Sequence, residues 1–223
     1  MAVAALVAAA ATTAHAAKLP VSSRTLFAMR SSADAMPGQL GYDAFTSAAP
    51  VVLNGHLANT GQPWTLMTGT LQVSGGLLQC TTCAGSYSAA IVDADLASVT
   101  ATVNVRSGAG SGAGGLILNA NATGNQSYGV SYGSGTVTLA RFNAGTMTVA
   151  ATRSVAVPPN NVNVPLVAVF DGTTYTVSFN GAPVMTYPLP AADQSSLGSN
   201  TYFGVVIIND ANVVRLDDFG VKR

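Results

Sequence analysis

Hydrophobic and polar residues alternate along most of the chain after residue 43. The clearest example is the segment 97–106, ASVTATVNVR, in which every second residue from Val99 onward is apolar. Successive side chains of a β-strand point to opposite faces of its sheet, so this alternation predicts a strand with one buried face. The polar face of that strand carries Thr102, Asn104 and Arg106.

Short turn sequences separate the alternating segments. Asp171-Gly172 and Asn180-Gly181 are dipeptides typical of two-residue hairpin turns, whose central residues need a positive φ. Further breaks lie at residues 133–135 and 143–145, and we expect the glycine-rich segment 107–115 to be a hairpin tip. The pattern predicts roughly a dozen short strands and no helix of useful length, and hence an all-β, two-sheet antiparallel sandwich or jelly roll.

Composition supports the all-β interpretation and narrows the choice of partners. Only 8% of the residues are charged, against about a quarter in an average soluble domain, and all nine acidic residues are aspartate. Glutamate and lysine favour helices, whereas the abundant valine and threonine favour strands. The net charge is zero, so the sequence predicts no nucleic-acid partner and no attraction to an anionic membrane.

The chain has two cysteines, Cys80 and Cys83, in a C-x-x-C pair. A zinc site would need further ligands, and the two histidines, His15 and His56, are isolated in the sequence. A redox pair would need a helix N-terminus, but strand-like segments lie on both sides. We therefore expect either a local disulfide or two unreactive thiols.

The first 41 residues differ from the rest of the chain. Residues 1–17 are rich in alanine and contain an A-x-A triplet ending at Ala16, as a secretory signal peptide would. No lysine or arginine precedes the apolar run, which is also too short to span a bilayer. We therefore favour an arm that docks on a neighbouring subunit, with a cleaved signal as the alternative. Residues 18–41 are interpreted as a linker.

From residue 42 onward the segments follow an order that resembles a known family. YDAFT is followed by LNGHLANTGQPWT, AAIVDADLASVTATVNV, GGLILNA, YTVSFNGAPV and a final VRLDDFGV. This order is similar to that of the concanavalin A-like lectin/glucanase jelly roll, in particular to laminin-G-like modules of bacteriophage virion proteins and secreted bacterial proteins. The resemblance implies one jelly-roll domain over residues 42–223, preceded by the arm and linker of residues 1–41. It implies little about activity, since this fold carries lectins, glycosidases, adhesins and spacers.

The segment 52–65, VLNGHLANTGQPWT, concentrates residues that are common in binding sites, including His56 and the only tryptophan of the chain, Trp64. In the modules that it resembles, this region joins the first strand to the sandwich and its tryptophan packs into the core. We therefore expect Trp64 to be buried with its indole N–H on a backbone acceptor. No second acid, base or nucleophile lies near His56 in the sequence, so we expect a loop residue that forms hydrogen bonds.

The sequence does not favour catalysis. Glycosidases of the resembling family work with paired carboxylates, in a glutamate motif that this chain lacks. Asp93 and Asp95 would share one strand face, but they lie at a strand boundary where aspartate is a common turn residue. Asp217 and Asp218 are adjacent and should point to opposite faces. No serine-nucleophile or phosphate-loop motif occurs, so the sequence predicts that the protein is not an enzyme.

Candidate residues remain for calcium and for sugars. Members of the resembling family often hold a structural calcium ion near the chain ends, where this sequence places Asp43, Asp217 and Asp218. The same aspartates could instead accept backbone N–H groups. The sugar candidates are polar or aromatic residues on strand faces: Asn104, Arg106, Tyr128, Tyr132 and Arg141. The face of the two tyrosines could equally belong to the core, which is the more common outcome.

Two functions are compatible with these features. The favoured hypothesis is a non-enzymatic structural protein of a bacteriophage virion (a decoration, fibre or minor tail component). Residues 1–41 would dock on other virion proteins, and the jelly roll would project and adhere to host-surface glycans. The alternative is a secreted, extracellular bacterial carbohydrate-binding module with residues 1–16 as its signal peptide. Low charge and the alanine-rich arm also lead us to expect a homo-oligomer.

Overall fold

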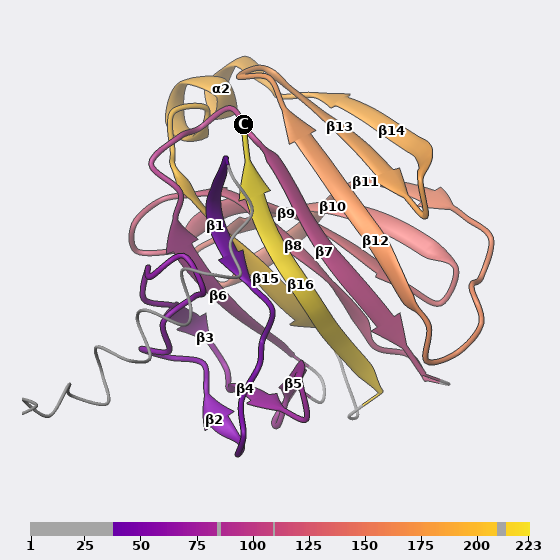
Figure 1. The fold of residues 1–223 in the computed structure, drawn as a ribbon. Helices are drawn as coiled ribbons and strands as arrows, with labels where there is room; N and C mark the ends of the chain where they lie inside the picture. The colour runs from indigo at the N-terminus through magenta and orange to yellow at the C-terminus, as the bar shows by residue number, and fades with distance from the viewer. Residues whose placement is uncertain (1–37, 84–85, 109, 209–212) are drawn as a thin grey trace, which may run out of the picture.

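The computed structural model describes residues 38–83, 86–108, 110–208 and 213–223. These residues form two antiparallel β-sheets packed face to face, with one short helix, α2 (Ala191–Leu197), at one end of the sandwich (Figure 1). The predicted all-β, two-sheet architecture is confirmed. The arm proposed for the N-terminus lies outside the described residues up to residue 37, and so does His15.

The first sheet contains nine strands, and β1 is joined to it through β16 alone. In spatial order the others are β14 (Ala182–Pro188), β13 (Thr174–Phe179), β12 (Asn163–Phe170), β7 (Thr100–Ser107), β16 (Val214–Lys222), β5 (Leu77–Cys80), β4 (Leu71–Ser74) and β2 (Val51–Val52). Because β1 (Gln39–Asp43) begins at Gln39, the sandwich starts before the boundary predicted at residue 42.

The second sheet contains seven strands. In spatial order they are β11 (Thr146–Ser154), β10 (Thr136–Asn143), β9 (Gln126–Gly133), β8 (Ala113–Ala120), β15 (Tyr202–Ile208), β6 (Tyr87–Asp93) and β3 (Thr65–Thr68). The segment 107–115 runs from β7 in the first sheet to β8 in the second. The expectation of a hairpin tip at this segment is therefore wrong. Alternation identifies a strand, but it does not show which sheet the strand joins.

The four short turns predicted from sequence are confirmed as hairpins. Residues 133–135 and 143–145 connect β9 to β10 and β10 to β11, and the dipeptides at 171–172 and 180–181 connect β12, β13 and β14. Asn180 and Gly181 have φ values of 52° and 77°, as this turn requires.

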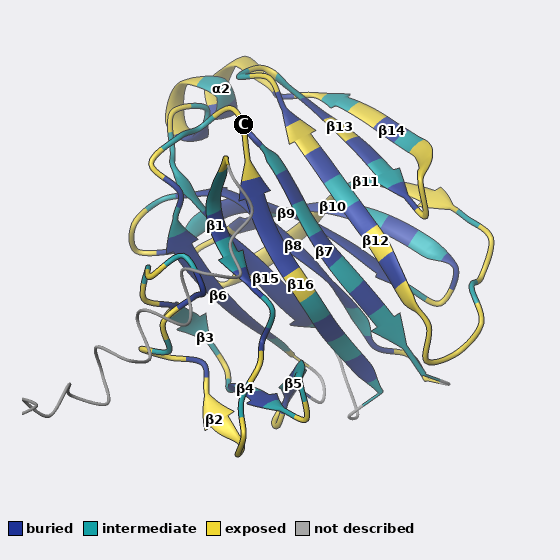
Figure 2. Cartoon of the chain, viewed as in Figure 1, coloured by how far each residue is buried: buried dark blue, intermediate teal, exposed yellow. Residues whose placement is uncertain are grey.

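The facing surfaces of the two sheets form the main core, and Figure 2 shows dark blue segments along β7 and β16. The alternation predicted for residues 97–106 holds: Val103 and Val105 are 1% exposed, and Asn104 and Arg106 point outward and are half-buried. Within the described part of the chain, no helix is long and apolar enough to cross a membrane.

Cys80 and Cys83 form a disulfide, which confirms the first of the two expectations for this pair. Both residues are 1% exposed, and the Oγ atom of Ser88 lies 3.2 Å and 3.1 Å from the two sulfur atoms. The bond closes the end of β5 onto the following turn. Disulfides persist in oxidising surroundings such as the cell exterior.

Candidate functional site

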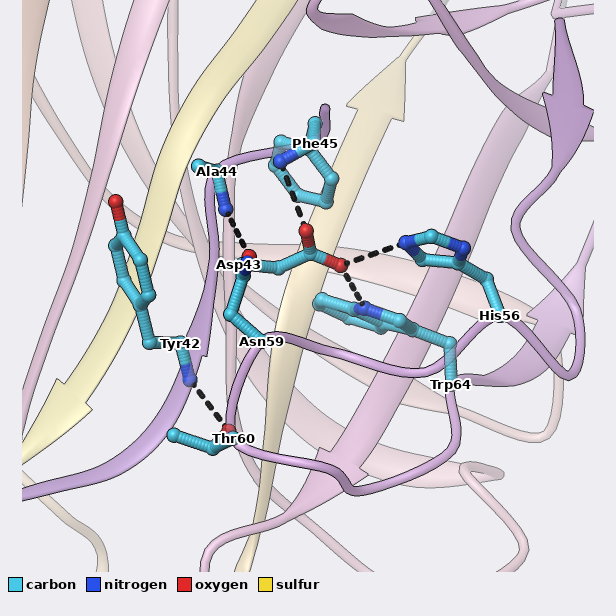
Figure 3. Close-up of polar contacts among 8 residues, drawn as sticks. All are labelled: Tyr42, Asp43, Ala44, Phe45, His56, Asn59, Thr60 and Trp64. Carbon is cyan, nitrogen blue, oxygen red and sulfur yellow. Dashed lines mark hydrogen bonds and ion pairs between the residues drawn. The ribbon is translucent and has the colours of Figure 1, made fainter. Parts of the chain in front are cut away.

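Asp43, the last residue of β1, organises the contacts of the segment 52–65 (Figure 3). Its side chain is buried, and Oδ1 accepts the N–H of Phe45 at 2.8 Å while Oδ2 accepts the indole N–H of Trp64 at 2.7 Å. Nε2 of His56 lies 3.4 Å from the same Oδ2. The predicted burial of Trp64 is confirmed, but its indole partner is a carboxylate and not a backbone carbonyl.

Trp64 connects this segment to the core. Its ring lies between those of Phe45 and Phe219, with centroid separations of 5.9 Å and 5.0 Å. The loop is also fixed to the residue after β1, because Oδ1 of Asn59 accepts the N–H of Ala44 at 2.9 Å. The segment 52–65 therefore holds the first strand against the sandwich, which is the structural role expected for it.

The three aspartates proposed for calcium do not come together. Both oxygens of Asp43 accept N–H groups inside the core, and its role as a calcium ligand stays a prediction. Asp217 and Asp218 lie on the outer face of the first sheet. Among the described residues, no group of three or more histidine, cysteine or acidic side chains is arranged to hold a metal ion.

A polar cluster covers the outer face of the first sheet where β7, β12 and β16 lie side by side. In the ladder, Asp217 lies opposite Asn104, and Asn163 lies opposite Arg106. Nδ2 of Asn104 donates to Asp218 at 3.0 Å, and Nδ2 of Asn163 donates to Asp217 at 3.0 Å. We call these residues, with Tyr42, the polar cluster: Tyr42, Asn104, Arg106, Asn163, Asp217 and Asp218.

A β-bulge brings the two adjacent carboxylates of this cluster to the same face. The register of β16 against β7 shifts between Asp217 and Gly220, and Asp218 has a φ of 47°, in the left-handed region. The carboxylate of Asp218 accepts hydrogen bonds from Asn104 and, at 3.3 Å, from the Tyr42 hydroxyl. The prediction that Asp217 and Asp218 point to opposite faces is wrong, because it assumed a regular strand.

Charge repulsion and burial act together on Asp217. The pKa of this carboxyl is raised above 3.8, first by partial burial and second by the negative charge of Asp218. Hydrogen bonds from the Asp218 N–H and from Asn163, and the positive charge of Arg106, oppose the increase. The cluster therefore combines acceptors, amide donors and a guanidinium on an open surface.

The tyrosines proposed for a sugar site are in the core. Tyr128 and Tyr132 are 1% and 2% exposed, so the sugar-stacking role proposed for them is wrong and the alternative, a core face, is confirmed. The Tyr128 hydroxyl donates to Asp193 on α2 at 2.6 Å, and burial raises the pKa of this phenol. The guanidinium of Arg141, the third of these sugar-site candidates, forms an ion pair with the same carboxylate at 2.8–2.9 Å.

Asp93 and Asp95 lie at the end of β6, where they form local turn contacts. Oδ1 of Asp93 accepts the N–H of Asp95 at 3.0 Å and the hydroxyl of Thr201 at 2.6 Å. Asp95 has a φ of 59°, which aspartate tolerates better than most residues. The turn interpretation of this segment is confirmed.

The outer face of the second sheet is apolar and closed. Ile91, Ile117 and Val206 are fully buried there. The rings of Tyr87 and Phe142 lie 5.1 Å apart although three strands separate β6 from β10, so the sheet curves until the two sides of this face meet. Sequence reasoning missed this surface. The signal was the continuous apolar runs AAIV, GGLIL and FGVVII in β6, β8 and β15, which are typical of strands buried on both faces.

Comparison with known proteins identifies the fold. No protein-family model and no curated protein matches the chain. Among solved structures, the carbohydrate binding module CBM66 from Bacillus subtilis has a TM-score of 0.56 at 14% identity, over 72% of this chain and 95% of that protein. A protein of unknown function with a galectin-like fold, also from Bacillus subtilis, has a TM-score of 0.52 at 15% identity, over 71% and 88%. The catalytic domain of an endo-1,3-beta-glucanase from Thermotoga petrophila has a TM-score of 0.51 at 9% identity, over 83% and 97%.

The chain therefore has a concanavalin A-like lectin/glucanase jelly-roll fold, as the resemblance in sequence implied. Identities this low establish a shared fold alone. Since both binding modules and glucanases share it, the function must be argued from the residues of the polar cluster.

Proposed function

We propose that this chain is a non-enzymatic carbohydrate-binding module and that a sugar binds at the polar cluster. The observation that carries the proposal is the bulge in β16, which turns the carboxylates of Asp217 and Asp218 to one exposed face beside two amides and a guanidinium. Strained backbone of this kind is concentrated at functional sites, where the surrounding structure maintains it.

The chemistry of the cluster suits adjacent hydroxyl groups. A carboxylate accepts two hydrogen bonds from neighbouring O–H groups, while amide and guanidinium N–H groups donate to the same oxygens. Asn104 and Arg106, predicted from sequence as sugar-binding residues, are members of the cluster, and Asp217, Asp218 and Asn163 extend their surface.

Binding without hydrolysis is favoured by the position of the cluster. It lies on an open sheet face, where water reaches the polar groups. Glycoside hydrolysis instead needs two carboxyl groups that flank the glycosidic bond, in a site from which bulk water is excluded. Solved structures with this fold include a carbohydrate binding module as well as a glucanase, and the site residues of this chain support the first role.

Substitution within the cluster tests this proposal. A glycan array identifies the sugar, and titration calorimetry then compares the wild type with Asn104→Ala and Asp217→Ala. We expect wild-type binding in the millimolar range, about −4 kcal/mol, and at least a roughly ten-fold loss for each variant. Thr176→Ala is the control, since Thr176 is exposed on the same face of the first sheet, two strands from β7. Unchanged affinity in both cluster variants would contradict the assignment of the site, and a blank array would contradict the function.

We propose further that the module is displayed on a bacteriophage particle, with residues 1–41 docking on other virion proteins. The alanine-rich composition of residues 1–17, which differs from that of the sandwich, supports a docking role for this arm. The disulfide fits either this location or the alternative, a secreted bacterial module. Intact mass and N-terminal sequencing of the natural protein distinguish them, because a secreted module would begin near Ala17 in the culture medium and a virion protein would retain the arm and sediment with particles.

A further inference from the structure

Most sheet edges of this sandwich are protected against pairing with another chain. An exposed edge strand carries backbone N–H and C=O groups that can pair with a second strand, and proteins block this with short strands, proline or covering loops. The strands β2 and β3 at two edges have only two and four residues. The edge strand β14 contains Pro183 and Pro188. The free side of β1 is covered, because the Tyr42 N–H donates to Thr60 Oγ1 at 3.0 Å.

The edge strand β11 lacks these forms of protection. It has nine residues, none of them buried, and contains no proline, lysine or acidic residue. Met147 and Val149 are 40% and 54% exposed. Within the described residues no strand lies on its outer side, since the order of the second sheet ends at β11. This is the sheet edge of the described structure that is best suited to pairing with another strand.

A bulge limits where regular pairing is available. On β11, Val149 lies opposite Ala140 and Ala151 lies opposite Leu139, so Ala150 has no partner in β10. The first part of the strand, residues 146–149, is regular and places Met147 and Val149 on one face of the sheet.

We propose that β11 pairs antiparallel with β11 of a second copy of this chain, about a two-fold axis at Thr148. In this register Met147 of each copy lies opposite Val149 of the other. The dimer therefore has two symmetric Met147–Val149 contacts between exposed apolar side chains. Thr148 lies opposite Thr148, and the paired stretch 146–150 contains no charged residue that would oppose its own copy. The second sheets of the two copies become one continuous sheet.

A second copy fits this edge better than the N-terminal segment does. Residues 1–17 are mostly alanine, which favours helix and is depleted in strands. An identical strand is self-complementary about a two-fold axis, and two-fold dimers are the most common oligomers. A pairing of five residues buries less surface than a standard permanent interface, so we expect weak, concentration-dependent association. Two polar clusters on one dimer would raise the avidity for a repeated sugar, but the pairing does not depend on the sugar-binding proposal.

Cysteine crosslinking tests the register. In Thr148→Cys the two new cysteines would face each other across the axis, within the Cα–Cα separation of roughly 4.4–6.8 Å that a disulfide needs. In Thr146→Cys they would be four residues apart along the strands, about 13 Å, which is too far. Under mild oxidation at high protein concentration, we expect a covalent dimer of Thr148→Cys to form at least ten times faster than one of Thr146→Cys. Equal rates, or no dimer of Thr148→Cys, would overturn the proposal.

Sedimentation equilibrium supplies an independent measurement. Val149→Lys places a charge in the proposed pairing, and Val169→Lys places one on the first sheet, where Val169 is 40% exposed on β12. We expect the average mass of the wild type and of Val169→Lys to rise with concentration toward the dimer, and that of Val149→Lys to stay at the monomer. The same mass for all three proteins, whether monomer or dimer, would show that β11 is not the interface.

Discussion

Asp217 is the residue whose protonation should depend most clearly on its neighbours in the polar cluster. Partial burial and the charge of Asp218 raise its pKa in the folded state above the ordinary 3.8. The folded protein therefore binds this proton more tightly than the unfolded chain does. The stabilisation is complete below the unfolded pKa and is lost as the pH rises through the raised folded pKa.

This linkage predicts a specific difference between two pH profiles. The free energy of unfolding of the wild type, minus that of Asp217→Asn, should fall as the pH rises from below 4 through the raised pKa of Asp217, and should then become constant. Urea unfolding followed by Trp64 fluorescence gives both profiles. Thr176→Ala, at an exposed residue of the same sheet that does not titrate, is the control and should give a difference that does not change with pH. A flat difference for Asp217→Asn would show that folding does not raise the pKa of Asp217.

Single residues also show how far sequence reasoning reaches. The burial of Trp64 could be predicted because the segment after it alternates, whereas its acceptor, Asp43, is 21 residues away and becomes a neighbour only through folding. The sequence could not show whether the side chain of Tyr128 points into the core or toward solvent, because the residues around it are compatible with both. Its partner Asp193 is 65 residues away, on a helix that the pattern did not predict.

Elements closed by local turns were the most predictable, and one of these turns contains a residue with an unfavourable backbone conformation. Ala144 and Gly145 connect β10 to β11 with φ values of 47° and 83°. Glycine adopts this left-handed conformation freely, and asparagine and aspartate tolerate it. Other residues, including alanine, are strained there by roughly 1–2 kcal/mol. Ala144 is exposed, and its N–H donates to the Asn125 carbonyl at 2.7 Å, a bond that glycine would keep.

Ala144→Gly should therefore stabilise the protein. Relief of strain exceeds the added entropy of glycine in the unfolded chain, so we expect a gain of about 0.5 kcal/mol in the free energy of unfolding. Ala182→Gly is the matched control: this alanine is also exposed but lies in β14, where glycine should cost about 0.5–1 kcal/mol. Urea unfolding at low protein concentration measures both. A loss in both variants would show that the strain at Ala144 is negligible.

On the scale of the whole molecule, the sequence pattern predicts strands better than it predicts their neighbours. Hairpin pairs such as β9–β10 follow from local turns. The pairing of β1 with β16, at opposite ends of the chain, and the step from β7 into the other sheet depend on packing between distant segments. The bulge at Asp217 also depends on the neighbouring strand. The arrangement of the polar cluster could therefore not be predicted from the alternation of side chains along a regular strand.

One ion pair connects α2 to the second sheet at one end of the sandwich. Asp193 on α2 is 8% exposed, and it accepts hydrogen bonds from Arg141 on β10 and Tyr128 on β9. A helix of seven residues is too short to be stable alone, so α2 depends on such tertiary contacts.

Arg141→Met should therefore loosen α2 and destabilise the whole fold, because it leaves Asp193 buried with a single donor. Removing one partner of a fully buried pair costs roughly 3–5 kcal/mol, but the Arg141 side chain is 29% exposed, so we expect about 1–3 kcal/mol. The double variant Arg141→Met/Asp193→Leu should recover part of this loss, since no unpaired charge remains. Arg153→Met, at an exposed arginine of β11 whose guanidinium bonds the Thr152 carbonyl, should change stability by less than about 0.5 kcal/mol.

Hydrogen exchange of the α2 amides separates local from global effects. If their protection is unchanged in Arg141→Met, the helix does not depend on the ion pair.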